Sequence, residues 1–442
     1  MNFIPYYIDQ YQKAHPRNLP AFASDIKERA MEWLADATFP SAKDENYLYT
    51  RVAPIFEQKL ALHRKPKTVY GQDMPCLYET RNPNGEALNE VNPETIDILI
   101  HNGYHLPDNP IRQFPGGIIV GSFAGMIKQF EHIYLNFYRN YKLSDDVLVN
   151  LNTMLSGDGF FLFVPAGARP DKPVQITNLF DACNDALIQP RNLIIMEAGS
   201  SAELMVIDHT PSGKSCVCND VTEVALGEAA TLEMVRLQQV NDSTRLFTHT
   251  SVQQAASSRM KTHYMTLGGG TVRNNLRVTL ADTKAEHFAG GLSLTQQNEH
   301  IDNNILIEHA SPDCQSNQLL KHILSGKSTG AFTGRIIVDK DARKTLAYQK
   351  SSNVLLHSEA KMNIRPQLEI DADDVKCSHG ATVGQLNTEA LFYLRSRGID
   401  EAGAKRILLH AFAGETIHHI SCEPFRKSIL KLTEKKLEKM SN

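Results

Sequence analysis

Short runs of apolar residues, many of them alternating with polar ones, recur through the middle of the chain. Between about residues 96 and 384, segments such as GFFLFVPAG, RNLIIMEAG and TGRIIVDKD each have the length of one β-strand and end at Gly, Asp, Asn or Pro. Long helical patterns are scarce there, apart from the stretch from 144 to 157. The pattern therefore predicts a mainly β region.

Two of these segments resemble each other. EAGSSAELMVID (197 to 208) and ALGEAATLEMVRL (225 to 237) share a glycine, a step of small residues and an alternating strand, and Gly199 and Gly227 lie 28 residues apart. A loose repeat of this length is typical of a β-solenoid, in which each coil buries its inner face against its neighbours. A β-sandwich would show a similar pattern, so the repeat alone leaves both architectures open.

The N-terminal region, residues 1 to 95, is predicted to be mainly helical. Apolar residues recur at helical spacing from Ile26 to Ala37. Residues 76 to 95 are rich in Asn, Pro and Glu, which indicates a linker or a long loop before the β region of residues 96 to 384.

The final segment, residues 385 to 442, returns to helical patterns. In IDEAGAKRILLHAFAGE, the predicted apolar stripe consists of Ile407, Leu408, Ala411 and Phe412. Two interpretations are possible: these helices pack on the β region of their own chain, or they form an arm that docks a partner.

Composition narrows the class of protein. Apolar residues make up 42% of the chain, and 46 basic residues nearly balance 50 acidic ones, which argues against a general nucleic-acid-binding protein. No apolar run reaches the roughly 18 residues of a membrane span, and the first residues show no secretory signal. Seven scattered cysteines suggest a reducing cytoplasm rather than a disulfide framework.

No complete nucleotide-binding motif is present. GKS occurs at 213 to 215 and at 326 to 328, but the upstream glycine of a phosphate-binding loop is replaced by Asp208 and Lys321. The GGG at 268 to 270 does not continue into a dinucleotide-binding pattern. Any ATPase activity must therefore come from another chain.

Two groups of cysteine and histidine have weak metal-binding patterns. The C-V-C at 216 to 218 places two thiols on one side of a strand, which is too few for a structural zinc site. Glu415, His418, His419 and Cys422 would share one helix face, but no second helix completes a bundle site. Buried small residues and a solvated or partner-facing helix surface are the simpler interpretations.

The stretch DADDVKCSHGATVG, residues 371 to 384, brings three carboxylates, a thiol and an imidazole together. Cys377 and His379 are two positions apart and would point the same way on a strand, and this pair suits iron or zinc. A buried cysteine beside a backbone-bonded histidine is the structural alternative. The aspartates fit a turn between strands, or, with His379, the site of a β-helix carbohydrate lyase or metal-dependent hydrolase.

The segment from 376 to 415, KCSHGATVGQLNTEALFYLRSRGIDEAGAKRILLHAFAGE, resembles the C-terminal signature of the SufB/SufD family of iron–sulfur cluster assembly proteins. GDGFFLFVPAGARPDKPVQI (157 to 176) is similar to the strand and turn that introduce the family's β-helix. FPSAKDENYLYTRVAPIF (39 to 56) is similar to its N-terminal motif, with Tyr47 and Leu48 where Trp-Lys is usual. The C-S-H-G form, and the lack of an N-terminal C-x-x-C-x-x-x-C cluster, resemble the SufD branch.

The resemblance implies a right-handed parallel β-helix core, flanked by helical regions, in a non-ATPase scaffold subunit. It implies an interface with a SufB-like paralogue at which a cluster is built, with His379 and Cys377 as candidate ligands. It also implies C-terminal helices that dock a SufC-like ATPase. The candidate docking residues are Phe392, Tyr393, Arg395, Arg397, Ile407, His410 and Phe412.

The expected protein is a cytoplasmic, non-enzymatic subunit with no nucleic-acid or membrane partner. No stably bound cofactor is expected, but iron or an iron–sulfur cluster would bind transiently at the interface with the paralogue. Such a shared site needs only one or two ligands from each chain, which explains an incomplete Cys–His pair. A homodimer is possible for the isolated chain, because an edge that pairs with the paralogue could pair with itself.

Overall fold

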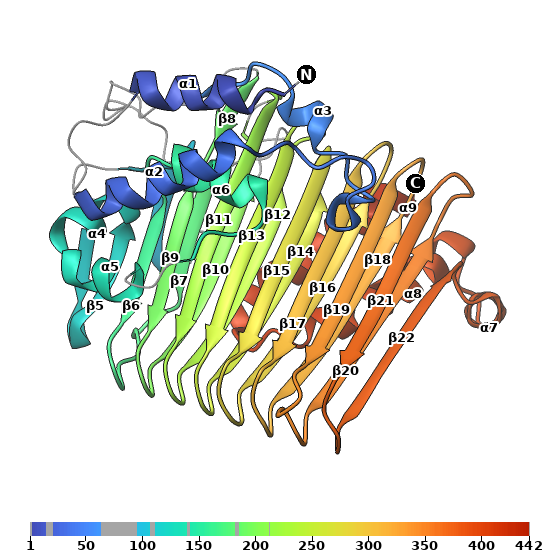
Figure 1. The fold of residues 1–442 in the computed structure, drawn as a ribbon. Coiled ribbons are helices and arrows are strands. Elements are labelled where there is room, and N and C mark those ends of the chain that lie inside the picture. Colours follow the sequence, from blue (N-terminus) through green and yellow to red (C-terminus); the bar gives the residue numbers. More distant parts are fainter. Residues whose placement is uncertain are drawn as a thin grey trace.

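Two mainly parallel β-sheets, wound as one flattened coil, form the centre of the molecule (Figure 1). The computed structural model describes residues 2–14, 21–62, 95–106, 111–138, 142–181, 185–211 and 213–441. The predicted linker at 76 to 95 lies outside these residues, except for Thr95. The mainly β fold, with a β-solenoid core flanked by helices at both ends of the chain, is confirmed.

Within the described residues, sheet A has 12 strands and sheet B has 10. Sheet A consists of β1 (Ala61–Leu62), β4 (Ile111–Phe114), β5 (Ile118–Ser122), β6 (Phe160–Val164), β8 (Ala186–Ile188), β9 (Arg191–Met196), β11 (Cys216–Leu226), β13 (Arg245–Gln254), β15 (Thr271–Leu280), β17 (His300–His309), β19 (Thr329–Val338) and β21 (Lys361–Ile370). Sheet B consists of β2 (Ile96–His101), β3 (Tyr104–Leu106), β7 (Val174–Leu179), β10 (Ser201–His209), β12 (Thr231–Gln239), β14 (Arg259–Gly268), β16 (Glu286–Thr295), β18 (Gln315–Leu324), β20 (Leu346–Leu355) and β22 (Lys376–Gly384).

From β9 onward the chain alternates between the sheets, and each strand pairs in parallel with the strand two places further on. Val252 pairs with Val278, which in turn pairs with Ile307, so the same inward positions stack from coil to coil. Inward apolar residues of both sheets, among them Val224, Leu276 and Ile305, form the main core. The alternation read from the sequence therefore has its physical origin in one buried face per strand.

The corners between a sheet A strand and the next sheet B strand share one feature. Each contains a residue with positive φ, and most of these residues are not glycine. The series is Gly199, Ala229, Ser257, Lys284, Asp313, Lys344 and Asp374. The corners also bond to one another, as in the donation from the Ala229 N–H to the carbonyl of Ala256 at 2.8 Å.

The positions of the positive-φ corner residues show that the 28-residue repeat predicted from the sequence is not the structural repeat. Gly199 and Gly227 do lie at successive corners, but they are not equivalent, because Ser201 pairs with Thr231 in a register of 30 residues. The structural equivalent of Gly199 is Ala229. Gly227 is required for a different reason: a Cβ there would meet the backbone nitrogen of Ala198 at 2.8 Å.

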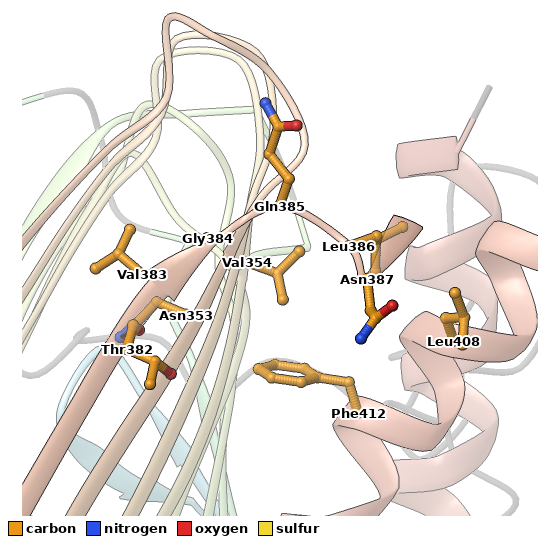
Figure 2. A pocket seen from close by; sticks show the side chains of 10 residues that line it. All are labelled: Asn353, Val354, Thr382, Val383, Gly384, Gln385, Leu386, Asn387, Leu408 and Phe412. Carbon is orange, nitrogen blue, oxygen red and sulfur yellow. Dashed lines mark hydrogen bonds between the residues drawn. The ribbon is translucent and has the colours of Figure 1, made fainter. Parts of the chain in front are cut away.

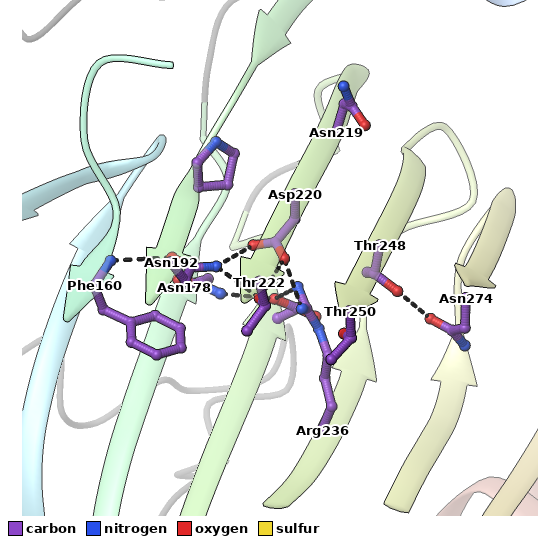
Figure 3. Close-up of polar contacts among 12 residues, drawn as sticks. Phe160, Asn178, Asn192, Asn219, Asp220, Thr222, Arg236, Thr248, Thr250 and Asn274 are labelled. Atoms are coloured by element: carbon purple, nitrogen blue, oxygen red, sulfur yellow. Dashed lines mark hydrogen bonds and ion pairs between the residues drawn. The ribbon is translucent and has the colours of Figure 1, made fainter. Parts of the chain in front are cut away.

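A row of buried polar side chains also runs through the interior of the solenoid (Figure 3). Arg236 donates from Nε to Asp208 at 2.6 Å and from Nη1 to Asp220 at 2.8 Å. Asn192 extends this group by donating to Asp220 at 2.9 Å. All four side chains are nearly or fully buried, so the ion pairs compensate the cost of taking the charges out of water.

Further along the row the hydrogen bonds point in one direction. Asn274 donates to Asn303, Asn303 donates to Nε2 of His322, Nδ1 of His322 donates to Asn353, and Asn353 donates to the carbonyl of Thr382. Because the Asn353 Oδ1 only accepts, His322 is neutral with its proton on Nδ1. The row ends on β22, so it ties the last strand to the interior.

Helices cover the outer faces of both sheets. They are α1 (Ile4–Ala14), α2 (Ala21–Ala35), the 3₁₀ turns η1 (Glu45–Tyr47) and η2 (Pro115–Gly117), α3 (Ala53–Phe56), α4 (Phe123–Gln129), α5 (Glu131–Tyr138), α6 (Val147–Leu155), α7 (Thr388–Ser396), α8 (Glu401–Ile417) and α9 (Glu423–Ser441). The predicted helix around 144 to 157 is α6, and Asp146 caps it by accepting from the Leu148 N–H. None of the described helices has both the length and the apolar character needed to cross a membrane.

The N-terminal segment around η1 lies on the outer face of sheet A. The ring of Tyr47 lies under the guanidinium of Arg273, with 4.5 Å between Cζ and the ring centroid. Thr50 donates to Asp302 at 2.6 Å, and Arg273 forms an ion pair with the same carboxylate. The aromatic and threonine positions of this motif therefore fasten the N-terminal region across β15 and β17.

Helices α8 and α9 pack on the outer face of sheet B, where Val235, Leu237 and Leu292 are apolar. The predicted stripe of α8 was wrong in its phase: Leu409 and Ile417 face the sheet, whereas Ile407 is 46% exposed. The apolar surface of the sheet selects the face that is buried, and local periodicity cannot reveal it. Two of the three C-terminal helices thus follow the first interpretation, packing on their own chain.

Three buried imidazoles should make the fold sensitive to acid. Burial lowers the pKa of His287 to about 3 and the pKa values of His309 and His322 to about 4. Between about pH 6.5 and 4 the unfolded chain binds protons that the folded chain does not, so the free energy of unfolding falls as the pH falls, by up to about 1.4 kcal/mol per pH unit and site.

We therefore expect a lower urea midpoint at about pH 5.5 than at about pH 7.5. His309→Asn should flatten this dependence, whereas the same change at the exposed His418 should keep it. A midpoint that does not change between the two pH values would contradict the prediction.

Candidate functional site

The solenoid is unfinished at the end where β21 and β22 lie (Figure 1). β21 pairs with β19 and β22 pairs with β20, and among the described residues no strand pairs with their other edges. We call these two outer edges the open end. Their backbone donors and acceptors are available to another strand, which is the usual basis of pairing between chains.

Cys377 and His379 both lie on β22, opposite Ala347 and Gln349 of β20. Cys377 is half-buried and packs against an interior cluster that includes Ile336. His379, two positions on, belongs to the same strand face but is exposed, because no coil covers it. The structure therefore brings the two residues to one face at the open end, as the spacing predicts.

The chemistry of the two side chains differs. Burial raises the pKa of the Cys377 thiol, although a hydrogen bond with the backbone of Ala347 acts in the opposite direction. The thiol must lose its proton to bind a metal, so a nearby cation has to supply that free energy. The exposed imidazole of His379 is the more accessible of the two candidate ligands.

The aspartates at 371 to 374 form the last corner of the series described above. Asp374 has φ of 56°, and its carbonyl accepts from the Lys344 N–H at 2.8 Å. The N–H of Asp371 donates to the carbonyl of Val338 at 2.9 Å. The prediction of a turn between strands is therefore confirmed, and the position of the three carboxylates follows from the solenoid.

Three large apolar side chains are exposed on β20, β21 and β22. Tyr348, Ile370 and Val383 are 44%, 40% and 47% exposed. Exposed large apolar residues on the last strands of a sheet are typical of an interface with another protein.

The candidate docking residues separate into two groups. Phe392 and Tyr393 on α7 are 74% and 58% exposed, and α7 has no buried residue. Arg395, Arg397 and Ile407 are also exposed. His410 and Phe412 are half-buried, and the Nζ of Lys321 lies 4.1 Å from the ring centroid of Phe412.

A single buried cation attaches α8 to sheet B. Lys321, which is 3% exposed, donates to the carbonyl of Phe412 at 3.0 Å and pairs with Glu415. Lys350 of the next coil lies 3.3 Å from the same carboxylate. No sequence motif marks Lys321, since its partners lie about 90 residues away and only the fold brings them together.

A cavity of about 340 Å³ lies between the end of β22 and α8 (Figure 2). Its walls include Asn353 and Thr382, which end the polar row, and Leu408 and Phe412 of α8. The cavity therefore separates the open end from the C-terminal helices, and both contribute to its wall.

The two weak metal patterns of the sequence do not form sites among the described residues, where no group of three or more His, Cys, Asp or Glu side chains is arranged to hold a metal ion. Cys216 and Cys218 are buried in an apolar cluster, and burial raises the pKa of both thiols. Glu415 pairs with lysines, and burial raises the pKa of Cys422 to about 12. The first group is therefore a pair of buried side chains, but the expected solvated helix face of the second group was wrong, because α8 ends at Ile417 and Cys422 is buried against sheet B.

Comparison with known proteins gives consistent results. Residues 179–412 match the family model described as SUF system FeS cluster assembly, SufBD core domain, and residues 1–176 match the SufBD protein N-terminal region. The chain is 31% identical over 288 residues to the iron–sulfur cluster assembly protein SufD of Escherichia coli, covering 64% of this chain and 68% of that protein. It is 27% identical over 450 residues to SufD of Bacillus subtilis, covering 98% and 97%. An iron–sulfur cluster assembly SufBD family protein of Synechocystis is 30% identical over 339 residues, covering 73% and 74%.

Proposed function

Because the chain belongs to the SufBD family of iron–sulfur cluster assembly proteins, we propose that it is a SufD-like, non-ATPase scaffold subunit that joins a SufB-like paralogue and a SufC-like ATPase. It acts in the cytoplasm and binds iron or a cluster only transiently. The observation that carries this proposal is the open end, where an unfinished solenoid presents His379 and Cys377 beside free strand edges.

The open end is the proposed surface for the paralogue. A second solenoid of the same family would supply strands of matching spacing to β21 and β22, and its side chains would complete the ligand set that His379 and Cys377 begin. The same edges allow a homodimer when the paralogue is absent.

Helix α7 and the exposed side of α8 are the proposed surface for the ATPase. Phe392 and Tyr393 are large and exposed, and their helix, α7, has no buried residue. Exposed aromatic residues of this kind are typical anchor residues at an interface. Because α8 is held on sheet B by Lys321, a partner on this surface would be positioned rigidly relative to the open end.

Removing both aromatic anchors should weaken ATPase binding without affecting the fold. Each anchor of this kind contributes about 2 kcal/mol, so we expect Phe392→Ala with Tyr393→Ala to weaken binding at least about 30-fold. Co-expression with the cognate SufC-like protein, followed by affinity capture and titration, measures this.

Trp33→Ala provides a matched control, because Trp33 is an exposed aromatic residue on α2, far from α7 in the chain. Unaltered capture by the double variant would exclude α7 as the docking helix. Failure of the native chain to capture the ATPase at all would contradict the proposed function.

The lyase or hydrolase alternative has no observation in its favour. It would require the aspartates at 371 to 374 as catalytic groups, and they occupy a corner that recurs along the solenoid. We therefore retain the scaffold as the proposed function.

A further inference from the structure

Two buried glutamine side chains form a ladder that leads to His379. Gln318 on β18 pairs in register with Gln349 on β20, and Gln349 pairs with His379 on β22. Gln318 is fully buried and Gln349 is 3% exposed. Nε2 of Gln349 donates to Oε1 of Gln318 at 2.9 Å, so this rung bonds to the coil before it, whereas Nε2 of Gln318 has no hydrogen-bond partner among the described residues.

Oε1 of Gln349 is buried and has no hydrogen-bond partner in the part of the chain that the structure describes. Because the amide nitrogen is used in the bond to Gln318, the oxygen is the atom of Gln349 that remains able to accept a hydrogen bond from the next coil. The side chain is also confined on its inner side, since a Cβ on Gly334 would come within 2.0 Å of Nε2. A buried acceptor without a partner requires an explanation in a native structure.

The residue paired with Gln349 on the next strand, β22, is His379. Strand neighbours in register lie about 4.8 Å apart, which is within reach of an N–H···O bond between their side chains. His379 shares its strand face with Cys377, and Cys377 packs into the interior. An imidazole N–H donating to Oε1 of Gln349 would repeat the donation that Gln349 makes to Gln318.

We propose that Gln349 is a positioning residue for His379: it accepts one ring N–H and leaves the other ring nitrogen unprotonated and directed to the open end. Ligating histidines commonly donate their second N–H to a carbonyl or carboxylate, which fixes the tautomer and the ring orientation. The role of His379 as a ligand rests on the proposed function, but the tautomer that Gln349 selects does not.

The tautomer can be read in the full-length chain by nitrogen-15 NMR of labelled histidine, with the His379 resonances identified by their loss in His379→Asn. Above about pH 7.5, where imidazole is neutral, we expect one dominant tautomer in the native chain. Gln349→Met keeps the length of the side chain and removes the acceptor, so it should give a mixture of tautomers. Gln318→Met is the matched control, because it breaks the same ladder one coil deeper and leaves the acceptor beneath His379 in place.

A second measurement addresses the ligand role. In the complex with the SufB-like paralogue, titration with cobalt(II) alone should show binding that is about 10- to 100-fold weaker for Gln349→Met than for Gln318→Met. An unchanged tautomer in Gln349→Met, or a mixture already in the native chain, would overturn the proposal. A tautomer shift without any cobalt binding by the native complex would instead contradict the proposed function and leave the positioning role standing.

Discussion

Replacing His379 with alanine should nearly abolish the supply of iron–sulfur clusters while leaving the fold intact. The side chain is exposed at the open end, so its loss should change the free energy of unfolding by no more than about 0.5 kcal/mol. The loss of its proposed role as a ligand should have a larger effect, since even residues that only orient a ligand are worth about 10- to 100-fold in metal affinity or activity. We therefore expect at least about a tenfold decrease in the activity of a cluster-dependent enzyme, in a cell that relies on this pathway.

Ser378→Ala is the matched control for this variant, because Ser378 is exposed on the same strand and points to the opposite face. Cys377→Ser should have a smaller effect than His379→Ala, because the Cys377 thiol is partly packed into the interior and its pKa is raised by burial. Normal enzyme activity in His379→Ala, with the complex intact by size-exclusion chromatography, would remove this residue from the mechanism.

Replacing Arg236 with methionine should cause the largest loss of stability of any single substitution considered for this chain. Asp208 and Asp220 are fully buried, and the guanidinium pairs with both of them. Without it, two carboxylates remain in the interior with no cation, and breaking a buried pair in this way costs about 3–5 kcal/mol. The midpoint of urea unfolding at neutral pH should fall accordingly.

The exposed pair of Arg259 and Glu286 provides the control. Nε of Arg259 lies 3.4 Å from Oε1 of Glu286, and both side chains are exposed to water. Arg259→Met should therefore lower the free energy of unfolding by less than about 1 kcal/mol. Adding Asp208→Asn and Asp220→Asn to Arg236→Met should recover part of the loss, because neutral amides need no counter-charge. Equal effects of the two arginine substitutions would contradict the proposed cost of the buried charges.

Alternation along each strand predicted a mainly β region with a loose repeat, and the resemblance to the SufB/SufD family, rather than the repeat, favoured a solenoid over a sandwich. The corners could not be predicted. Of the seven corner residues with positive φ, only Gly199 is a glycine. Ala229 and Ser257 adopt the same backbone conformation, and nothing in the sequence marks them as corner residues. Tertiary contacts within the stack impose that backbone conformation. This is why a glycine-based alignment is displaced by two residues.

In the candidate site too, neighbours along one strand could be predicted from the sequence, whereas neighbours on different strands could not. The shared face of Cys377 and His379 follows from a spacing of two along a strand, which the sequence states directly. Gln349 lies 30 residues before His379, and only the register of β20 with β22 makes them neighbours. The buried face of α8 likewise depends on the apolar surface of sheet B, so Leu409 could not be preferred to Ile407 from periodicity alone.

The open end also affects how readily different parts of the solenoid unfold locally. In a stack of coils each unit is stabilised by both neighbours, except the last, which has one. Most side chains of β19 are buried, whereas those of β21 are at best half-buried and those of β22 are almost all exposed. We therefore expect the free energy of local opening to fall coil by coil from β19 towards β22, and the amide hydrogens of β22 to exchange faster than those of β19. A partner strand paired with the outer edge of β21 or β22 would slow this exchange.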